Sequence, residues 1–240
     1  MNAEMTQVEP ELHSLTRVQP LVKICGIRST SAAIVATEFG ADYLGFILAP
    51  SKRQIDIATV ARIKSELVAW QRENDEQTLP LLTAVVVNLG VRNLREIASS
   101  GAVDVIQLSG DESPDILGEI DFPISKALRI DPTHGESAAR QEIEAWLNHA
   151  RPAGSILIDA WHPGAYGGTG LTADWVTIAR LAADYPIWLA GGLTPENVAS
   201  AISDVRPFGV DVSSGVETDG QKDVAKINAF LGAVGTTARS

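Results

Sequence analysis

The sequence contains one cysteine, Cys25, in 240 residues. A single thiol excludes an intrachain disulfide and a metal site made of several cysteines, and it fits a reducing compartment. The histidines do not supply a metal site either, because no pair has metal-ligand spacing. They are His13, His134, His149 and His162. We therefore expect no bound metal.

Positive charge and long apolar runs are also scarce. The net charge of −11 argues against an electrostatic nucleic-acid binder. No apolar run approaches the roughly 18 residues of a membrane span, and residues 1–20 lack the apolar segment of a secretory signal. We expect a cytoplasmic protein that acts without nucleic acid or membrane. Nothing in the sequence decides between a monomer and a homodimer.

Residues 21–235 alternate between short runs rich in β-branched residues and segments of helical period. The predicted strands are Val22–Ile27, Tyr43–Leu48, Leu81–Val87, Asp104–Leu108, Ile124–Arg129, Ile156–Ile158, Ile187–Ala190 and Gly209–Val212. The predicted helices are Ser29–Phe39, Ile57–Arg72, Val91–Ser100, Pro114–Leu117, Ser137–Ala150, Thr172–Ala183, one that begins with Thr194 as N-cap and Pro195 as first residue, and Lys222–Val234.

This alternation implies βαβ units and a parallel sheet. Eight units over about 220 residues fit an α/β fold of one domain, the (β/α)₈ TIM barrel, whose usual length is near 250 residues. We expect a flexible arm at residues 1–20, the barrel at 21–235 and a frayed tail at 236–240. The alternative is a doubly wound open sheet, against which no G-x-G-x-x-G or phosphate-loop motif follows the first strand.

Polar residues and glycines gather where the predicted strands end, which is where such barrels carry their active sites. Three glycine-rich loops follow the last three strands: Gly167–Gly170, Gly191-Gly192 and Ser213-Ser214-Gly215. Glycine lets backbone N–H groups approach an anion, and the last two loops occupy the usual phosphate site of the fold. One such loop alone is as well explained by a tight turn, but three in succession favour a pocket for a small phosphorylated substrate.

Cys25 and Lys23 share one face of the first predicted strand, because strand side chains alternate. The lysine charge would favour a thiolate, although a lone cysteine is often an inert buried residue. Asp159, at the end of the sixth strand, is a candidate acid of raised pKa, salt-bridge partner or helix cap. A thiol and a carboxyl facing one cavity make a plausible general base and general acid. Arg53 is either a clamp for an anionic substrate group or a solvated loop charge.

Seven segments together resemble phosphoribosylanthranilate isomerase. They run in order from about Leu21 to Phe230, and their combination is highly specific. They are Val22–Ile27, Gly40–Phe46, Ser51–Arg53, Val105–Glu112, Gly167–Gly170, Leu189–Val198 and Gly209–Glu217.

The resemblance implies a barrel isomerase of tryptophan biosynthesis that needs no metal or organic cofactor. Its reaction is the Amadori rearrangement of N-(5-phosphoribosyl)anthranilate to 1-(2-carboxyphenylamino)-1-deoxyribulose 5-phosphate. It implies Cys25 as general base, Asp159 as general acid and Arg53 as the holder of the anthranilate carboxylate. The expected phosphate grip comprises Gly191, Gly192, Asp211, Ser213, Ser214 and Gly215. Further substrate-binding candidates are Lys23, Gln107 and Gly168.

Two positions depart from the family pattern. Ser109 stands where the family usually has the histidine of Gln-Leu-His-Gly, and Leu171 stands where a lysine usually follows Gly-Gly-Thr-Gly. These changes motivate a barrel that binds sugar phosphates without catalysis. A second alternative is a broader isomerase that also accepts the corresponding histidine-pathway substrate.

Overall fold

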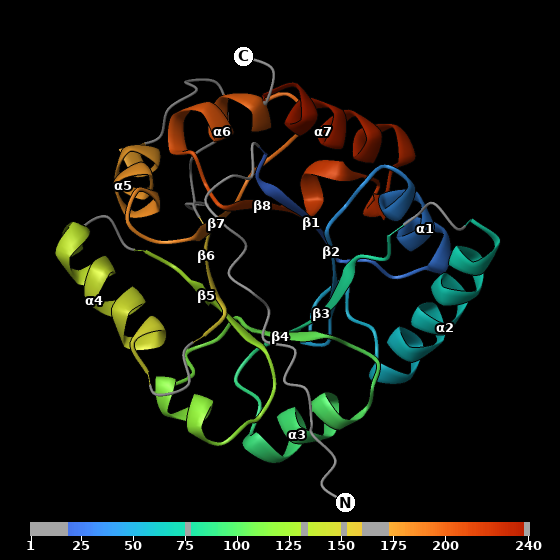
Figure 1. The fold of residues 1–240 in the computed structure, drawn as a ribbon, viewed down its shortest axis with the longest axis horizontal. Helices are drawn as coiled ribbons and strands as arrows, with labels where there is room; N and C mark the ends of the chain where they lie inside the picture. Colours follow the sequence, from blue (N-terminus) through green and yellow to red (C-terminus); the bar gives the residue numbers. More distant parts are fainter. Residues whose placement is uncertain (1–18, 75–77, 131–133, 150–152, 160–172, 238–240) are drawn as a thin grey trace, which may run out of the picture.

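Eight parallel strands form a closed barrel in which each strand pairs with the next and β8 returns to β1. The computed structural model describes residues 19–74, 78–130, 134–149, 153–159 and 173–237. The ring of strands lies inside a ring of helices (Figure 1). The strands are β1 (Leu21–Cys25), β2 (Tyr43–Ile47), β3 (Leu81–Val86), β4 (Val105–Leu108), β5 (Ile124–Leu128), β6 (Ser155–Asp159), β7 (Ile187–Ala190) and β8 (Gly209–Val212). The predicted barrel and its eight strands are confirmed.

The helices pack around the barrel through their apolar faces. On α2, for example, Val60, Ile63 and Leu67 are buried at helical spacing, and Asp56 caps the helix by accepting a hydrogen bond from the Thr59 N–H at 2.7 Å. The helices are α1 (Thr30–Glu38), α2 (Ile57–Glu73), α3 (Val91–Ser99), α4 (Gly135–Leu147), α5 (Ala173–Ala182), α6 (Val198–Val205) and α7 (Val224–Thr236), with short 3₁₀ turns η1 (Pro114–Gly118) and η3 (Ser214–Val216). None of the helices in the described ranges is long and apolar enough to cross a membrane.

Three predicted helix starts differ from the structure by two or more residues. Helix α4 begins at Gly135 rather than Ser137. Helix α6 begins at Val198 rather than Pro195, because the preceding residues form a turn in which the Asn197 side-chain oxygen accepts a hydrogen bond from the Thr194 N–H at 2.8 Å. Helix α7 begins at Val224 rather than Lys222, because Asp223 is its cap and the residues before it form a hairpin. The predicted arm at 1–20 and tail at 236–240 fall mostly outside the described residues.

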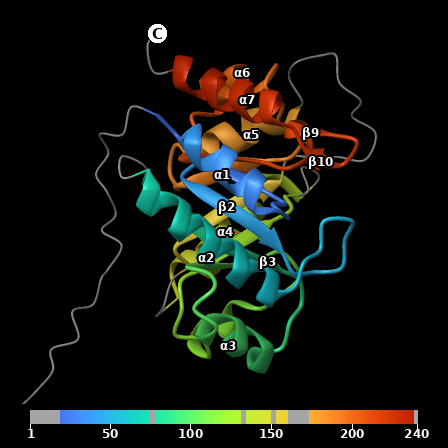
Figure 2. The same ribbon diagram turned by 90° about the vertical axis from the view of Figure 1, so that its right-hand side faces the viewer.

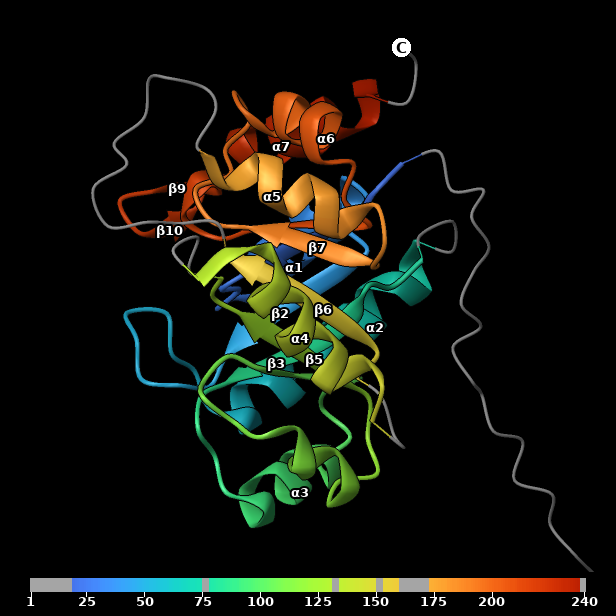
Figure 3. The ribbon, with the colours of Figure 1, turned by 90° about the vertical axis from the view of Figure 1, so that its left-hand side faces the viewer.

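That hairpin pairs β9 (Glu217–Thr218) with β10 (Gln221–Lys222) in antiparallel register. Its two turn residues, Asp219 and Gly220, have φ of 51° and 72°. Positive φ at both central residues is the geometry of a two-residue hairpin turn that favours Asp-Gly. Figures 2 and 3 show the hairpin projecting from the same end of the barrel as the loop after β2.

The apolar core has an outer and an inner part. The larger cluster lies between the strands and the helices, and a smaller one fills the barrel interior. The inner cluster is centred on Trp188, whose ring meets that of Tyr43 edge-on with centroids 5.1 Å apart. Leu157 and Ala190 are its other buried members.

Polarity changes along the barrel interior, into which alternate strand residues point. From the start to the end of β1 the inward positions are Leu21, Lys23 and Cys25, and on β6 they include Leu157 and then Asp159. The barrel is therefore filled by apolar side chains near the N-terminal ends of its strands and by polar ones near the C-terminal ends. This is the end at which the sequence places the chemistry.

Candidate active site

A buried polar network spans the barrel beneath the site. Lys23 on β1 is aligned with Asp211 on β8, and its ammonium lies 3.2 Å from the Asp211 carboxylate. The same ammonium donates a hydrogen bond to the Gln107 side-chain oxygen at 2.7 Å, and the Gln107 amide donates to the Ser109 hydroxyl at 3.0 Å. Burial alone would lower the pKa of Lys23, but Asp211 and the Cys25 sulfur hold that pKa above its ordinary value. Lys23 is therefore a fixed cation.

Cys25 ends β1 one inward position above Lys23, and β2 leaves room for it. Gly45 on β2 is aligned with Cys25, and a Cβ at this glycine would lie 2.7 Å from the Cys25 sulfur and 3.1 Å from Lys23 Cε. Any larger residue at position 45 would therefore displace the thiol. The absence of a side chain on β2 allows the thiol and the ammonium to occupy the same part of the barrel.

The thiol pKa does not follow the simplest expectation from the sequence. Burial raises the pKa of Cys25, while the charges of Lys23 and Lys222 act in the opposite direction. Lys23 thus acts to lower the thiol pKa, as predicted, but burial raises that pKa by more. The neutral thiol is therefore favoured near neutral pH, although Lys23 acts towards the thiolate, as the sequence suggested.

Asp159 is the last residue of β6 and is aligned with Ala190 on β7. It is half-buried at the same end of the barrel as Cys25. Its charge helps to raise the pKa of Asp211, for which burial is the main cause. Asp211 also acts on Cys25. The candidate acid and base therefore share an electrostatic neighbour, as expected for groups on one cavity.

The loops after β7 and β8 come together as the predicted phosphate site requires. A Cβ at Gly215 would lie 1.9 Å from the Leu193 carbonyl oxygen, so only glycine permits this approach. Gly191 and Gly192 have φ of 92° and 67°, which glycine adopts without strain. The buried Ser213 hydroxyl has no hydrogen-bond partner among the described residues. The third predicted loop, with Gly168, lies outside the described residues.

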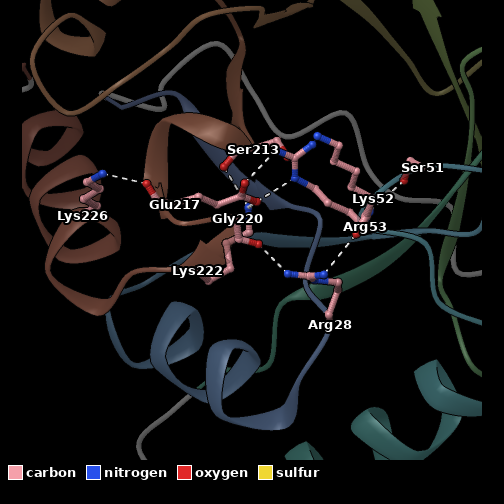
Figure 4. A network of polar contacts seen from close by, with 9 residues as sticks. All are labelled: Arg28, Ser51, Lys52, Arg53, Ser213, Glu217, Gly220, Lys222 and Lys226. Atoms are coloured by element: carbon pink, nitrogen blue, oxygen red, sulfur yellow. Dashed lines mark hydrogen bonds and ion pairs between the residues drawn. The ribbon is translucent and has the colours of Figure 1, made fainter.

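Arg53 is neither free nor simply solvated, because it forms a two-point ion pair with Glu217. Its Nε and Nη2 donate to the two Glu217 carboxylate oxygens, each at 2.7 Å. Lys222 donates to the same carboxylate at 2.8 Å and to the Ser213 carbonyl oxygen at 2.8 Å. Arg53, Lys222 and Glu217 thus form one cluster of charged side chains, which Figure 4 shows.

A second buried ion pair fixes the loops after β3 and β4. Lys126 on β5 lies 2.7 Å from Glu112, and both side chains are almost fully buried. Glu112 also accepts hydrogen bonds from the backbone N–H groups of Asn88 at 2.8 Å and Gly110 at 3.0 Å. This carboxylate joins two loops at the active-site end to the wall of the barrel.

This arrangement matches that of a known family. A family model described as N-(5'-phosphoribosyl)anthranilate (PRA) isomerase matches residues 22–233. The chain belongs to the N-(5'-phosphoribosyl)anthranilate isomerase family. The family predicted from the seven sequence segments is thereby confirmed, and so are the predicted isomerase activity and its place in tryptophan biosynthesis.

Several phosphoribosylanthranilate isomerases are closely similar to the chain. The N-(5'-phosphoribosyl)anthranilate isomerase of Roseiflexus castenholzii is 45% identical, over 91% of this chain and 100% of that protein. The crystal structure of the Thermotoga maritima enzyme is 34% identical, with a TM-score of 0.75 over 90% of this chain and 99% of that one. A structure in complex with reduced 1-(o-carboxyphenylamino)-1-deoxyribulose 5-phosphate is 32% identical, with a TM-score of 0.73 over 90% and 99% of the two chains.

One of the two departures from the isomerase pattern can be located. Ser109 replaces the usual histidine but accepts the hydrogen bond from Gln107, so the position remains part of the polar network. Leu171 lies outside the described residues.

Glu217 and Lys222 were not singled out from the sequence as site residues. Their pairing depends on the hairpin, in which they stand opposite one another. The signal for it was the dipeptide Asp219-Gly220 between two short polar runs, which predicts a two-residue turn.

Proposed function

We propose that this isomerase rearranges N-(5'-phosphoribosyl)anthranilate with Cys25 as general base and Asp159 as general acid. The observation that carries the proposal is the position of these two residues. Each stands at the inward-facing C-terminal end of a strand. The charge of Asp159 acts on Asp211, and the charge of Asp211 acts on Cys25. Polar groups at this end of a (β/α)₈ barrel are those that meet the substrate.

The steps follow from the acid and the base. Asp159, protonated, gives its proton to the ring oxygen as the C1'–O bond breaks, and the anilino nitrogen lone pair forms the C1'=N double bond. Cys25, as thiolate, then removes the C2' proton, and the electrons of that C–H bond form an enolamine. Transfer of a proton to C1' and loss of the C2' hydroxyl proton give the ketone. Each proton transfer by a positioned group typically contributes about 10²–10⁴-fold in rate.

The two protonation states place opposite demands on the site. Cys25 must lose its proton although burial raises its pKa, and Lys23 and Lys222 assist that loss. Asp159 must hold its proton until the ring opens. Ionisation of the thiol favours the active form, so we expect kcat/KM to rise with pH as Cys25 loses its proton.

The two anionic groups of the substrate, its phosphate and its carboxylate, are assigned to separate binding sites. We assign the phosphate to the loops at Gly191-Gly192 and Ser213–Gly215, where the unpartnered Ser213 hydroxyl is suited to an anion. We assign the anthranilate carboxylate to Arg53, which can present a planar pair of donors to it. The half-buried guanidinium lies beside Ser213 (Figure 4).

The test is turnover of freshly prepared substrate, followed by the loss of anthranilate fluorescence. We expect Cys25→Ala and Asp159→Ala each to lower kcat by at least about 100-fold, while both variants still bind the reduced product analogue. If both variants keep wild-type turnover, the assignment of acid and base is wrong. Binding of the analogue by the unaltered chain without any turnover would instead favour a non-catalytic barrel.

A further inference from the structure

We infer that Glu217 is a positioning residue that makes Arg53 selective for a substrate carboxylate. The inference rests on the proposed role of Arg53 and extends it to a residue with no assigned part in the reaction. Glu217 itself is buried below the surface, with 6% of its side chain exposed, so it acts through Arg53.

The geometry of the ion pair divides the guanidinium into two edges. Glu217 accepts hydrogen bonds from Nε and Nη2, which form one edge of the planar group. A guanidinium has five N–H donors, and no described residue accepts a hydrogen bond from Nη1. The edge made by Nη1 and the second Nη2 hydrogen is therefore left to a second carboxylate. With 28% of the Arg53 side chain exposed, this group can be reached by a ligand.

The stem of Arg53 lies close to the backbone of Gly26. A Cβ at Gly26 would lie 2.7 Å from Arg53 Cδ and 3.1 Å from the Ser213 hydroxyl oxygen. The arginine chain thus passes directly over the residue that follows Cys25. Because Glu217 holds the guanidinium, less conformational entropy of the Arg53 side chain remains to be lost when a ligand binds.

The charges leave room for one more anion. Burial alone would raise the pKa of Glu217, but the bonds from Arg53 and Lys222 lower that pKa to about 2, so the carboxylate is permanently ionised near neutral pH. Two cations therefore share one anion, with Lys222 only 4% exposed. The residual positive charge is neutralised by one carboxylate on the ligand. A neutral ring in its place would leave that charge uncompensated.

The hairpin sets these positions and is itself held in place. Lys226 at the start of α7 donates to the Glu217 carbonyl oxygen at 2.7 Å. Arg28 in the loop after β1 donates to the Lys52 carbonyl oxygen at 3.1 Å and also to that of Gly220. Hydrogen bonds from side chains to backbone carbonyl oxygens thus join the loop after β1, the loop that carries Arg53 and the hairpin that carries Glu217 (Figure 4).

The experiment compares two ligands in the full chain. One is the reduced product analogue, and the other is the same compound without the ring carboxyl group. We expect Glu217→Gln to weaken binding of the carboxylated ligand by about tenfold, the equivalent of about 1.4 kcal/mol, because the loss of the two-point alignment of Arg53 outweighs the attraction of the positive charge that the substitution leaves. The decarboxylated ligand should stay within about twofold. Arg53→Met should remove the preference, and adding Glu217→Gln to it should have little further effect on that preference, because the two residues act as one unit.

Glu136→Gln is the matched control, because Glu136 also pairs with two arginines, Arg140 and Arg180, but lies on α4. It should leave both affinities unchanged. If Glu217→Gln fails to fold, Glu217→Asp retains the charge but is one methylene shorter, and it should lose part of the preference.

Equal weakening of both ligands by Glu217→Gln, or weakening of neither, would overturn the inference. So would a loss of preference that simply adds to that of Arg53→Met. The proposed function fails differently. If Arg53→Met keeps the preference for the carboxylated ligand, the carboxylate assignment is wrong, and if Cys25→Ala and Asp159→Ala turn over normally, the catalytic assignment is wrong.

Discussion

Replacing Glu217 by glutamine should destabilise the protein in a way that depends on pH. The folded-state pKa of Glu217 is about 2, whereas an unperturbed glutamate titrates near 4.3. A difference of roughly 2.3 pKa units at about 1.36 kcal/mol each corresponds to about 3 kcal/mol of stability at pH 7. Only 6% of the side chain is exposed, so solvent and salt screening remove little of it.

The sign follows from the depressed pKa. The unfolded state binds a proton more readily than the folded state, so the contribution is complete above about pH 5 and declines as the pH falls from about 4.3 towards 2. At pH 3 roughly half of it, about 1.5 kcal/mol, should remain. Because a protonated glutamate and a glutamine are similar in shape and charge, the difference between the two proteins should vanish at still lower pH.

Thermal or urea unfolding of the wild type and Glu217→Gln at pH 7, 5, 4 and 3 measures this difference. At about 2–4 °C per kcal/mol for a chain of this size, the melting temperature at neutral pH should fall by roughly 6–12 °C. The other carboxylates are present in both proteins, and their effects cancel. Glu136→Gln should produce a far smaller change, because its ion pairs are solvent-accessible and screened. A difference between wild type and Glu217→Gln that is the same at pH 7 and pH 3 would refute the reasoning.

Three other substitutions test the structure. Lys23→Met should raise the pKa of the Cys25 thiol further, because it removes the largest charge effect that opposes burial. The ultraviolet absorbance of the thiolate, measured against Cys25→Ser, reports this single cysteine directly, and an unchanged pKa would contradict the prediction. Gly45→Ala should abolish most turnover, because its Cβ would lie 2.7 Å from the sulfur, and wild-type kcat would show that the thiol is dispensable. Lys126→Met should cost about 3–5 kcal/mol in urea unfolding by leaving Glu112 buried without its cation, and a loss below about 1 kcal/mol would mean that water replaces the ammonium.

The sequence was sufficient for the fold and for the placement of the candidate acid and base. The periodicity of the apolar residues predicted eight strand–helix units. In a parallel barrel the C-terminal ends of all strands lie at one end. Cys25 and Asp159 could therefore be assigned to one rim without coordinates. The strand alternation also placed Lys23 on the same side as Cys25.

The sequence was not sufficient for contacts that depend on packing. Arg53 and Glu217 are 164 positions apart, and they meet because β2 and β8, whose following segments carry them, both pair with β1. A two-residue turn makes Glu217 face Lys222. The pKa of Cys25 was missed for a related reason. The charge of Lys23 is visible in the sequence, but the extent of burial that outweighs it depends on side chains from the whole barrel.

The closure of the barrel places the proposed general base next to the arginine proposed to bind the substrate carboxylate. Strand β1 pairs with both β2 and β8, so the loops that follow those neighbours lie on either side of its C-terminal end. Arg53 comes from one loop and Glu217 from the region beyond the other, and they join across Gly26, the residue next to Cys25. A change that lengthens this ion pair is therefore expected to alter the contacts beside Gly26, the residue next to Cys25. Loss of carboxylate selectivity and loss of stability in Glu217→Gln would then have a single cause, which is the loss of the contact that joins the loops after β2 and β8 beside Gly26.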